Sequence, residues 1–420
     1  MRILVLSPYL PHPLSGHGGG EYVYGLVKHL SQSHEVTLVS FANHHEQELA
    51  DDLRALPIKV LLVTRWKGKQ ERLGASLLLT GLRLFQLVRS VILWQPYYVS
   101  KFYHPKMAKL IEEETRNTKY DIVQVEFAQM GHYVRFIRSG KPVLRAHDVV
   151  FRPAYRNYRS AGSVVRKLAL FVEWCRWAQY EPRMVKRYDH VLTFTEQDRA
   201  LLQRLAGIKQ VTYNARGIEV PSAIVPYEER DARTLLFVGA FDHSPNVDAA
   251  LWLCSEVYPL VCKECPDVRL HLVGKNPPSV LRTVAEEYPS IELLGFVSDL
   301  EKHYHSASIF VAPIRTGGGI KTKIIHAQSY GVPVVTTPLG AEGIEGTVNN
   351  STLVLGRTAK ELAAGILSLL RDRGKASSIG RKGRETAIVS YAWETTIRKQ
   401  IAIYQSLLST NHHNIGREDV

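Results

Sequence analysis

Short apolar runs rich in Val, Ile and Leu recur along the whole chain, and amphipathic stretches of helical period lie between them. Strands separated by helices are typical of parallel sheets that are covered on both faces. The predicted strands are 3–6, 36–39, 60–63, 122–125, 143–144, 191–194 and 211–213 in the first half, and 235–238, 270–273, 291–294, 309–311, 332–335 and 353–355 in the second. The pattern therefore predicts an α/β protein with two doubly wound, Rossmann-like domains.

A stretch without helical or strand period, 217–230, lies between the two series and contains two prolines. A chain of 420 residues also exceeds what a single hydrophobic core usually supports. We predict an N-terminal domain over 1–216 and a C-terminal domain over 217–394. In such folds ligands bind beyond the carboxyl ends of the strands, here in a cleft between the two facing domains.

The net charge of +13 comes from 53 basic and 40 acidic residues, and the excess is concentrated in two segments. Residues 65–106 contain eight Arg and Lys against Glu71 alone, and residues 152–187 form a second basic stretch. Such asymmetry is typical of contact with anionic lipid headgroups, a pyrophosphate-bearing acceptor or nucleic acid, and a merely solvated basic face is the alternative. Nucleic acid is the least favoured partner because no recognition module accompanies the basic residues.

The segment 73–94 is almost continuously apolar, with its few polar residues at helical spacing. Arg83 and Arg89 in mid-segment argue against a transmembrane span. A helix with a wide apolar face and basic flanks suits an anionic membrane surface, and the aromatic residues that follow (97–103) suit an interfacial belt. An ordinary helix packed on the sheet is the alternative, and both remain open.

Four cysteines, Cys175, Cys254, Cys262 and Cys265, are too few for a disulfide framework at this length, which favours a reducing compartment. Cys262 and Cys265 have no second Cys or His pair nearby to complete a metal site, so we expect them to be structural. Residues 1–8 indicate a buried first strand, because their apolar run is too short for a signal peptide. We expect a cytoplasmic protein, peripheral on the inner face of the plasma membrane if 73–94 contacts lipid.

Two glycine-rich turns, Gly18–Gly20 and Gly317–Gly319, each lie between a predicted strand and a predicted helix. Glycine leaves room where backbone N–H groups converge, and the helix N-terminus adds a partial positive charge. Each turn therefore suits a diphosphate or a sugar hydroxyl. The first lacks the dinucleotide fingerprint, because Ser40 and Phe41 stand where an acidic ribose ligand is expected. An oxidoreductase function is therefore disfavoured.

Five consecutive strand ends of the second half carry glycine, which keeps one edge of that sheet clear for a ligand. These glycines are Gly239, Gly274, Gly295, Gly317–Gly319 and Gly340. In the first half, His147 and Glu126 stand at strand ends, and we expect a functional role for His147 and an acceptor contact for Glu126. Arg152, in the second basic stretch, is a further acceptor candidate. Thr195 and Glu196 at a third strand end predict a helix cap with its first-turn acid.

In this order, these residues resemble the retaining glycosyltransferases of family 4, which have the two-Rossmann-domain GT-B fold. The resemblance extends from Gly18–Gly20 to Tyr391–Glu394, where the family's chain crosses back so that a C-terminal helix packs on the first domain. It implies that 395–420 complete the domain formed by 1–216. Gly239–Asp248, the triple glycine and Thr337–Gly343 are similar to a subgroup that acts largely on bacterial surface polysaccharides and lipid-linked oligosaccharides.

The resemblance implies a role for each matching residue. The backbone amides of Gly318, Gly319 and Ile320 would hold sugar hydroxyls and the β-phosphate, and Gly18–Gly20 would close on the same diphosphate. His147 would hydrogen-bond the donor sugar. The family transfers the sugar with retention, by same-face substitution without a protein nucleophile, and needs no metal or other cofactor where helix termini and lysines supply positive charge. The candidates are Gly18, Gly19, Gly20, Gly239, Lys275, Val297 (through its backbone, on the base), Gly317, Gly319, Ile320, Lys321 and His326 for the donor, His147, Gly318 and Lys323 for catalysis, and Glu126 and Arg152 for the acceptor.

Two departures separate this chain from the family pattern. The family commonly has two glutamates around the donor loop. The first is replaced here by Gly318, as it is in the subgroup, and the second, which binds ribose, is replaced by His326. The basic pair usual after the first strand of the second domain is also missing, and we expect four cations near the same edge to replace it: Lys321, Lys323, Arg315 and Lys275. Because His326 can still hydrogen-bond a ribose hydroxyl, we expect altered donor affinity rather than lost activity.

We therefore predict an enzyme, a retaining hexosyltransferase-type glycosyltransferase that uses a nucleotide-diphosphate sugar and a glycan or lipid-linked acceptor. One alternative is a GT-B nucleotide-sugar epimerase. The other is a catalytically weak, sugar-nucleotide-binding subunit of a polysaccharide assembly complex, for which His326 is the best support.

Overall fold

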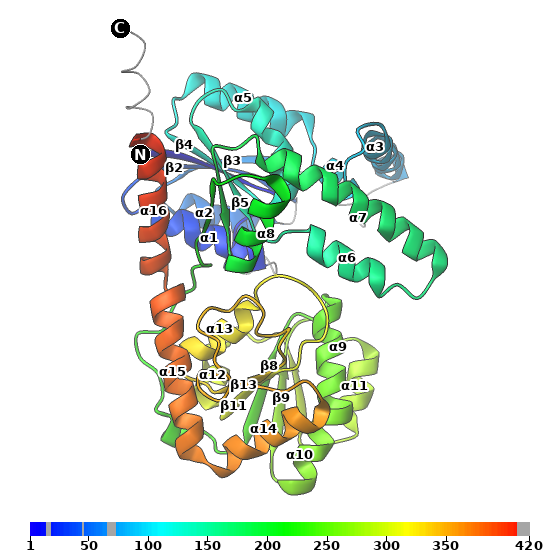
Figure 1. Ribbon diagram of the computed structural model, residues 1–420, viewed down its shortest axis with the longest axis vertical. Coiled ribbons are helices and arrows are strands. Elements are labelled where there is room, and N and C mark those ends of the chain that lie inside the picture. Colours follow the sequence, from blue (N-terminus) through cyan, green and yellow to red (C-terminus); the bar gives the residue numbers. More distant parts are fainter. Residues whose placement is uncertain (14–17, 44–45, 65–72, 410–420) are drawn as a thin grey trace. The chain divides into compact units, whose positions relative to one another are not determined.

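The computed structural model describes residues 1–13, 18–43, 46–64 and 73–409. These residues form two compact units, one made of Met1–Gly217 together with Thr396–Val420 and the other of Ile218–Thr395 (Figure 1). Each unit contains one sheet with helices packed on it, and each has a core of its own.

The sheet of the N-terminal unit is fully parallel and has seven strands in the order β3-β2-β1-β4-β5-β6-β7. Its strands are β1 (Arg2–Ser7), β2 (Glu35–Ala42), β3 (Lys59–Thr64), β4 (Ile122–Glu126), β5 (Lys141–Ala146), β6 (His190–Thr193) and β7 (Val211–Tyr213). The helices that follow them are α1 (Gly18–Leu30), α2 (Gln47–Arg54), α3 (Leu73–Ile92), α4 (Tyr97–Lys101), α5 (Pro105–Asn117), the 3₁₀ segment η3 (Ala128–Phe136), α6 (Phe151–Arg159), α7 (Val164–Val185) and α8 (Glu196–Ala206).

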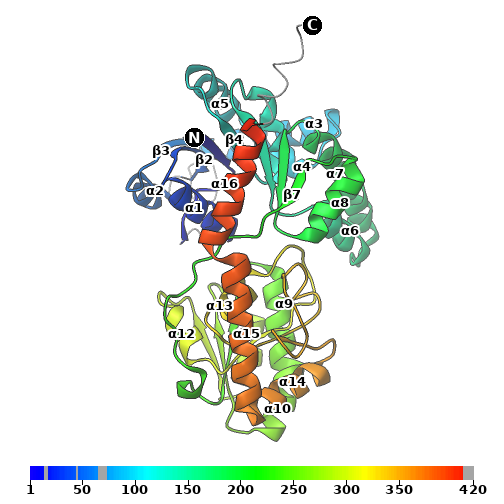
Figure 2. The same ribbon diagram turned by 60° about the vertical axis from the view of Figure 1, so that its left-hand side comes forward.

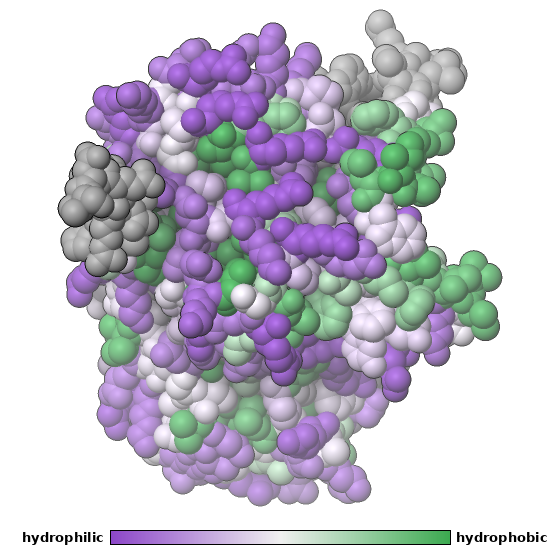
Figure 3. Space-filling model, turned by 45° about the horizontal axis from the view of Figure 1, so that its top comes forward, coloured by the Kyte–Doolittle hydropathy of each residue, from purple (hydrophilic) through white to green (hydrophobic). Residues whose placement is uncertain are grey.

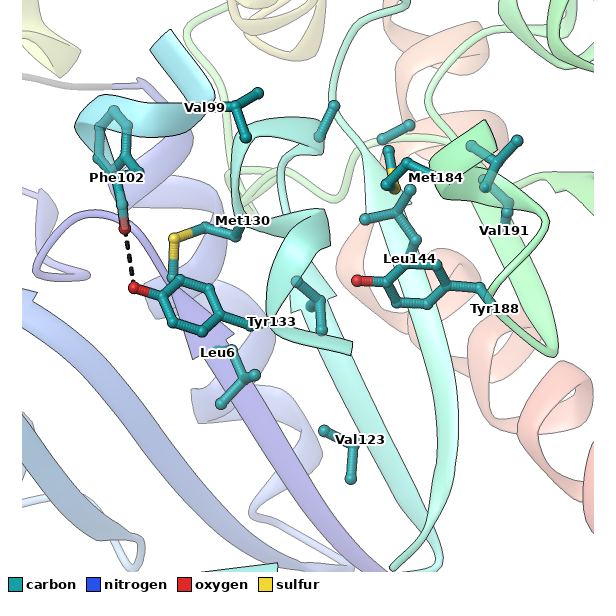
Figure 4. Close-up of a cluster of buried hydrophobic side chains, with 14 of the residues drawn as sticks. Leu6, Val99, Phe102, Val123, Met130, Tyr133, Leu144, Met184, Tyr188 and Val191 are labelled. Atoms are coloured by element: carbon teal, nitrogen blue, oxygen red, sulfur yellow. Dashed lines mark hydrogen bonds between the residues drawn. The ribbon is translucent and has the colours of Figure 1, made fainter. Parts of the chain in front are cut away.

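Apolar residues from neighbouring strands form the core beneath these helices, which is why the strands have almost no polar positions. Val123, Leu144 and Val191 come from β4, β5 and β6 and lie in one cluster with Met130 and Tyr133 of η3 (Figure 4). The Tyr133 hydroxyl is buried and donates a hydrogen bond of 2.8 Å to the carbonyl of Phe102. The core thus fixes η3, which follows the end of β4 directly.

The sheet of the C-terminal unit is also parallel, with six strands in the order β10-β9-β8-β11-β12-β13. Its strands are β8 (Thr234–Val238), β9 (Arg269–Val273), β10 (Ile291–Gly295), β11 (Ile309–Ala312), β12 (Val334–Thr336) and β13 (Val354–Leu355). Its helices are the short η4 (Tyr227–Glu229), α9 (Ser244–Trp252), the π segment η5 (Leu253–Val257), α10 (Tyr258–Glu264), α11 (Ser279–Glu286), α12 (Glu301–Ser306), α13 (Thr322–Ser329), α14 (Ala359–Arg371) and α15 (Arg373–Tyr391).

The last helix, α16 (Trp393–Ser409), returns to the N-terminal unit and lies against its sheet beside α1 (Figure 2). Buried polar side chains of α16 anchor it there: Gln400 donates to the side-chain carbonyl of Gln124 on β4 and accepts from Arg145 on β5. The return of a C-terminal helix to the first unit is confirmed.

Each of the thirteen predicted strand runs overlaps one observed strand, and the doubly wound α/β architecture is confirmed. Thr195 caps α8 as predicted, because its hydroxyl accepts from the backbone N–H of Asp198 at 3.0 Å. Residues 73–92 form a helix, whereas the basic residues at 65–72 lie outside the described part of the chain. Within the described ranges, none of the helices combines the length and hydropathy needed to cross a bilayer.

Candidate active site

The strand order reverses between β1 and β4 in the first sheet and between β8 and β11 in the second. Loops leaving such neighbouring strands diverge, and doubly wound folds bind ligands at this point of the carboxyl edge. Gly18–Gly20 follow β1 and Glu126 ends β4, while Gly239 follows β8 and Gly317–Gly319 follow β11. The structure therefore places both glycine turns, Glu126 and Gly239 at the reversal point of their own sheet, while His147, Lys275 and Val297 follow the neighbouring strands β5, β9 and β10.

In the N-terminal unit, His147 and Glu126 form a buried pair. The Nε2 atom of His147 lies 2.7 Å from Oε2 of Glu126. Glu126 has no exposed surface and His147 is 8% exposed. The other carboxylate oxygen, Oε1, accepts from the Gln124 side chain. Because β4 and β5 are neighbours in the sheet, two strand ends predicted separately meet as one hydrogen-bonded unit.

Aromatic rings enclose the imidazole of His147. Phe127 stacks on it with ring centroids 3.5 Å apart, and Tyr22 and Phe194 meet it edge to face. Phe127 has φ 69° and ψ 140°, a conformation that costs a side chain other than glycine on the order of 1–3 kcal/mol. Such strain is concentrated at functional sites, and here it lets the Phe127 ring cover the face of His147.

Burial sets the protonation of this pair. It raises the pKa of Glu126 to about 7, against the opposing charge of Arg145. Burial also lowers the pKa of His147 well below its usual value, helped by the positive charges of Arg216 and Arg145. His147 is therefore a neutral imidazole at physiological pH. Its Nδ1 atom takes no part in the bond to Glu126, so a neutral hydrogen bond to a sugar hydroxyl suits it.

A chain of buried polar side chains connects this pair to α16. Glu126 bonds to Gln124, which bonds to Gln400 and Tyr404. The Oε1 atom of Gln400 also accepts from Arg145 Nη2 at 2.5 Å. Because every member is buried, each needs its partner, and the C-terminal helix thereby holds the end of β4 in place.

We expect Gln400→Leu to lower the free energy of unfolding by about 1–3 kcal/mol, because it removes the buried hydrogen bond that Nη2 of Arg145 donates and one of those that Gln124 accepts. Urea denaturation followed by circular dichroism measures this loss. Gln405→Leu is the matched control, since Gln405 lies exposed on the same helix. Equal stability of the two variants would contradict the network.

Gly18–Gly20 form the first turn of α1, so their backbone N–H groups belong to the helix N-terminus. Arg216 is buried and donates to the carbonyl of Gly18. Its guanidinium lies 5.4 Å above the ring of Tyr22. The residues just before Gly18 are outside the described ranges. A positive charge thus stands directly beside the glycine turn.

In the C-terminal unit, two glycines allow the close approach of loops around β8. A Cβ on Gly274 would lie 2.0 Å from the carbonyl oxygen of Gly239, and a Cβ on Gly239 would lie 2.6 Å from Nζ of Lys323. Neither position can hold a side chain without moving its neighbours. Because Gly239 has no side chain, the ammonium of Lys323 can lie directly beside the end of β8.

The Gly317–Gly319 turn has its shape fixed by backbone conformation and by Lys321. Gly317 and Gly319 have φ of 98° and 68°, which glycine adopts without strain. The ammonium of Lys321 donates to the carbonyls of Gly318 at 3.1 Å and Gly319 at 2.5 Å. The turn leads directly into α13, and the partial positive charge at the N-terminus of that helix attracts an anion.

Lys323, in the first turn of α13, donates to Oδ1 of Asn246 at 2.6 Å and lies 4.9 Å above the ring of Phe237. Burial, followed by the nearby charge of Lys321, lowers its pKa from 10.5 to about 7. An anion placed beside Lys323 would reverse that shift.

The other two predicted cations are already engaged in ion pairs. The ammonium of Lys275 lies 3.2 Å from the carboxylate of Asp242. Arg315 donates two hydrogen bonds to Asp248, and its guanidinium lies 4.5 Å above the ring of Trp252. His326 lies half-buried on α13, one turn beyond Lys323, and Val297 follows β10 half-buried. Lys321 and Lys323 are therefore the cations that the fold brings to the glycine turn.

Of the two acceptor candidates, Arg152 lies half-buried in α6, while Glu126 is completely buried and bonded to His147 and Gln124. Sequence reasoning missed the supporting residues: Gln124, Arg145, Arg216, Asn246 and Gln400. The signal for Gln124 and Arg145 was a polar residue inside an apolar strand run. Nothing local marked Arg216 or Gln400, whose partners lie far away in the sequence.

Within the described ranges, no three His, Cys, Asp or Glu side chains come together in a way that could hold a metal ion. Cys262 and Cys265 are both free thiols, at the C-terminal end of α10.

Known proteins resemble this chain in sequence and in fold. Residues 232–372 match the family model "Glycosyl transferases group 1". An uncharacterized 44.6 kDa protein from the cps region of Klebsiella pneumoniae is 26% identical over 60% of this chain and 65% of its own length. A GDP-mannose-dependent α-(1-6)-phosphatidylinositol monomannoside mannosyltransferase of Mycobacterium tuberculosis is 27% identical over 34% of this chain and 40% of its own. This chain thus spans about two-thirds or less of these relatives.

Solved structures agree on the architecture. Sucrose-phosphate synthase from Thermosynechococcus elongatus superposes with a TM-score of 0.67 at 18% identity, covering 98% of this chain and all of the other. The chain therefore has the GT-B fold, and the unit that carries the Gly317–Gly319 turn matches the group 1 glycosyl transferases.

Proposed function

We propose that the protein is a glycosyltransferase that moves a sugar from a nucleotide-diphosphate sugar to a glycan or lipid-linked acceptor with retention of configuration. The observation that carries this proposal is the Gly317–Gly319 turn with Lys321 and Lys323 beside it, at the reversal point of the sheet in the unit that matches the family. Backbone N–H groups and two lysines suit a departing diphosphate.

In this proposal the residues have separate tasks. The backbone of Gly318, Gly319 and Ile320 holds the diphosphate and sugar hydroxyls, and Lys323 gains a proton as the diphosphate arrives. His147, held by Glu126, bonds the donor sugar through its neutral imidazole. These positive groups make the reaction independent of a metal. The chemistry rests on charge stabilisation and positioning, with no protein nucleophile.

Glu126 acts through His147 in this account and not on the acceptor, because its carboxylate is buried and doubly bonded within the unit. Arg152 remains the acceptor candidate. A lipid-linked acceptor fits the basic, apolar helices of the N-terminal unit, and the mannosyltransferase relative is named for a lipid acceptor. We infer a cytoplasmic protein that works at the inner face of the plasma membrane.

The test is transfer from a panel of labelled nucleotide sugars to lipid and glycan extracts, with the anomeric configuration of the product read by NMR. A product of retained configuration supports the proposal. Free sugar and nucleotide released without an acceptor would indicate an epimerase-type reaction instead. Tight donor binding with no turnover on any acceptor would indicate a binding subunit.

We expect Lys321→Ala/Lys323→Ala to weaken nucleoside diphosphate binding at least tenfold, with nucleoside binding about unchanged, because only the phosphates meet these lysines. Titration calorimetry with both ligands measures the difference. Lys360→Ala, an exposed lysine on α14, is the control. Equal losses for nucleoside and diphosphate would contradict the assignment.

The lowered pKa of Lys323 adds a pH signature to this prediction. In the empty site Lys323 loses its proton above about pH 7, and a bound diphosphate raises its pKa again. Binding at pH 8 should therefore take up a proton, and affinity should fall as pH rises from 7 to 9. Calorimetry at pH 8 in buffers of different ionisation enthalpy detects the uptake, which Lys323→Met should abolish.

A further inference from the structure

In the described part of helix α3, from Arg83 onward, large apolar side chains face solvent. Leu84, Phe85, Leu87, Val88 and Val91 are about half exposed, and Ile92 at the helix end is 74% exposed. Figure 3 shows these hydrophobic side chains as a green group on the right-hand side of the N-terminal unit. Single exposed apolar residues are ordinary, but a contiguous group marks an interaction site.

The opposite face of α3 carries the polar residues and points into the protein. Gln86 and Ser90 are buried, and donate to the carbonyls of Lys101 at 3.3 Å and Gln95 at 2.8 Å. Arg89 lies 3.8 Å above the ring of Tyr103. A helix packed on a sheet buries its apolar stripe. The described part of α3 does the reverse, so the fold holds its hydrophobic face outward.

The hairpin of α6 and α7 provides a second exposed apolar group. No residue of α6 is buried, and Val164, Val165 and Leu168 at the start of α7 are 85%, 80% and 66% exposed. The base of the hairpin is firmly held instead: Glu181 accepts from the backbone N–H groups of Val150 and Phe151, each at 2.8 Å. The tip is thus an exposed apolar end on an anchored support, at the right in Figure 3.

The elements that carry the two groups contact each other. Arg176 of α7 donates to Ser90 at 3.2 Å and lies 5.0 Å from the ring of Trp94, just beyond α3. Glu173, also on α7, accepts from the backbone N–H of Tyr97. We call these residues together the exposed apolar surface: Leu84, Phe85, Leu87, Val88, Val91, Ile92, Val164, Val165 and Leu168.

Charge identifies the occupant of this surface. The segments that carry it, 73–110 and 149–172, contain five Arg or Lys each and no Asp or Glu. Arg83, Arg159, Arg166 and Lys167 among them are exposed. Exposed cations on the segments that carry an apolar face attract an anionic bilayer, where apolar side chains enter the acyl region and basic ones meet the phosphates. The same excess of positive charge would repel a second copy of this chain.

We propose that α3 and the tip of the α6–α7 hairpin together dock the protein onto a bilayer that contains anionic phospholipid. The hairpin tip and α3 insert their apolar side chains, and Arg166 and Lys167 contact headgroup phosphates beside the tip. This extends the peripheral location proposed above to two defined elements. It does not depend on sugar transfer, since docking needs neither donor nor acceptor.

Cosedimentation of the full chain with vesicles tests the proposal. The wild type should bind vesicles of phosphatidylglycerol and phosphatidylcholine at least tenfold better than vesicles of phosphatidylcholine alone, and salt should weaken binding. Val164→Ser/Val165→Ser/Leu168→Ser should reduce binding on the order of tenfold. Arg166→Glu/Lys167→Glu should remove the preference for anionic vesicles. Val280→Ser/Val389→Ser changes two exposed valines of the other unit and should bind like the wild type.

Equal binding by the wild type and both surface variants would overturn the proposal, as would no binding at all. Sedimentation velocity without vesicles tests whether a second copy of the chain, rather than lipid, covers this surface. A wild-type dimer that is lost in the Val164→Ser/Val165→Ser/Leu168→Ser variant would mean that it does. Titration of nucleoside diphosphate to the same preparations reports the donor site independently. If the protein binds nucleotide but not vesicles, the docking proposal fails and the proposed donor site is unaffected.

Discussion

Gly318→Val is expected to reduce sugar transfer to background while the protein stays folded. Gly318 lies between Gly317 and Gly319, which have positive φ angles, and the carbonyls of Gly318 and Gly319 accept from Lys321. Gly318 itself is not among the residues with positive φ, so valine there imposes no left-handed strain. Its side chain would instead occupy the space where a diphosphate or sugar approaches the backbone. Initial rates with the identified donor and acceptor measure the loss.

Gly374→Val is the matched control for this change. A Cβ at Gly374, in the first turn of α15, meets only Asp372 at an ordinary contact distance of 3.4 Å. We expect its rate to stay within about twofold of the wild type, and both variants to keep their thermal midpoints within a few degrees. Undiminished turnover in Gly318→Val would remove the turn from the site.

His147→Ala is expected to lower the rate of the chemical step by roughly 10²–10³, with nucleoside diphosphate affinity nearly unchanged. A neutral imidazole that bonds the sugar stabilises the transition state most, and losing one such preorganised partner costs about this much. Single-turnover kinetics give the chemical step, and calorimetry gives the affinity. An equal loss in both would indicate that His147 only supports the structure around it.

Glu126→Gln distinguishes holding His147 from direct chemistry. It keeps the size of the side chain but removes the carboxylate that faces Nε2 at 2.7 Å. Because Glu126 acts through His147 in this account, the rate should fall less than in His147→Ala, and the double variant should be no slower than His147→Ala alone. Additive losses would show that Glu126 has a separate role.

The strands and the strand-end glycines were predictable because buried parallel strands have to be continuously apolar and because loops that approach backbone closely have to lack side chains. Gly239 and Gly274 illustrate the second reason directly, since a Cβ on either would collide with its neighbour. The family resemblance assigned roles to these positions, but it did not give the distances between their side chains.

Pairings between distant residues were not predictable from one sequence. His147 and Glu126 were both identified as strand ends, yet their bond depends on the register of β4 with β5, which pairs Glu126 with Arg145. Gln400 supports the same site from a helix more than 250 positions away, as its bond to Arg145 shows. Hydrophobic periodicity also finds the apolar face of α3 but not its direction, because the same stripe suits burial or a lipid surface.

The most direct measurement of the central claim is acceptor-dependent release of nucleoside diphosphate from nucleotide sugars by the wild type and by Gly318→Val. The account predicts release by the wild type only when an acceptor fraction is present, equal in amount to the sugar transferred, and none by Gly318→Val. Release without an acceptor, or the same release by both proteins, would contradict it.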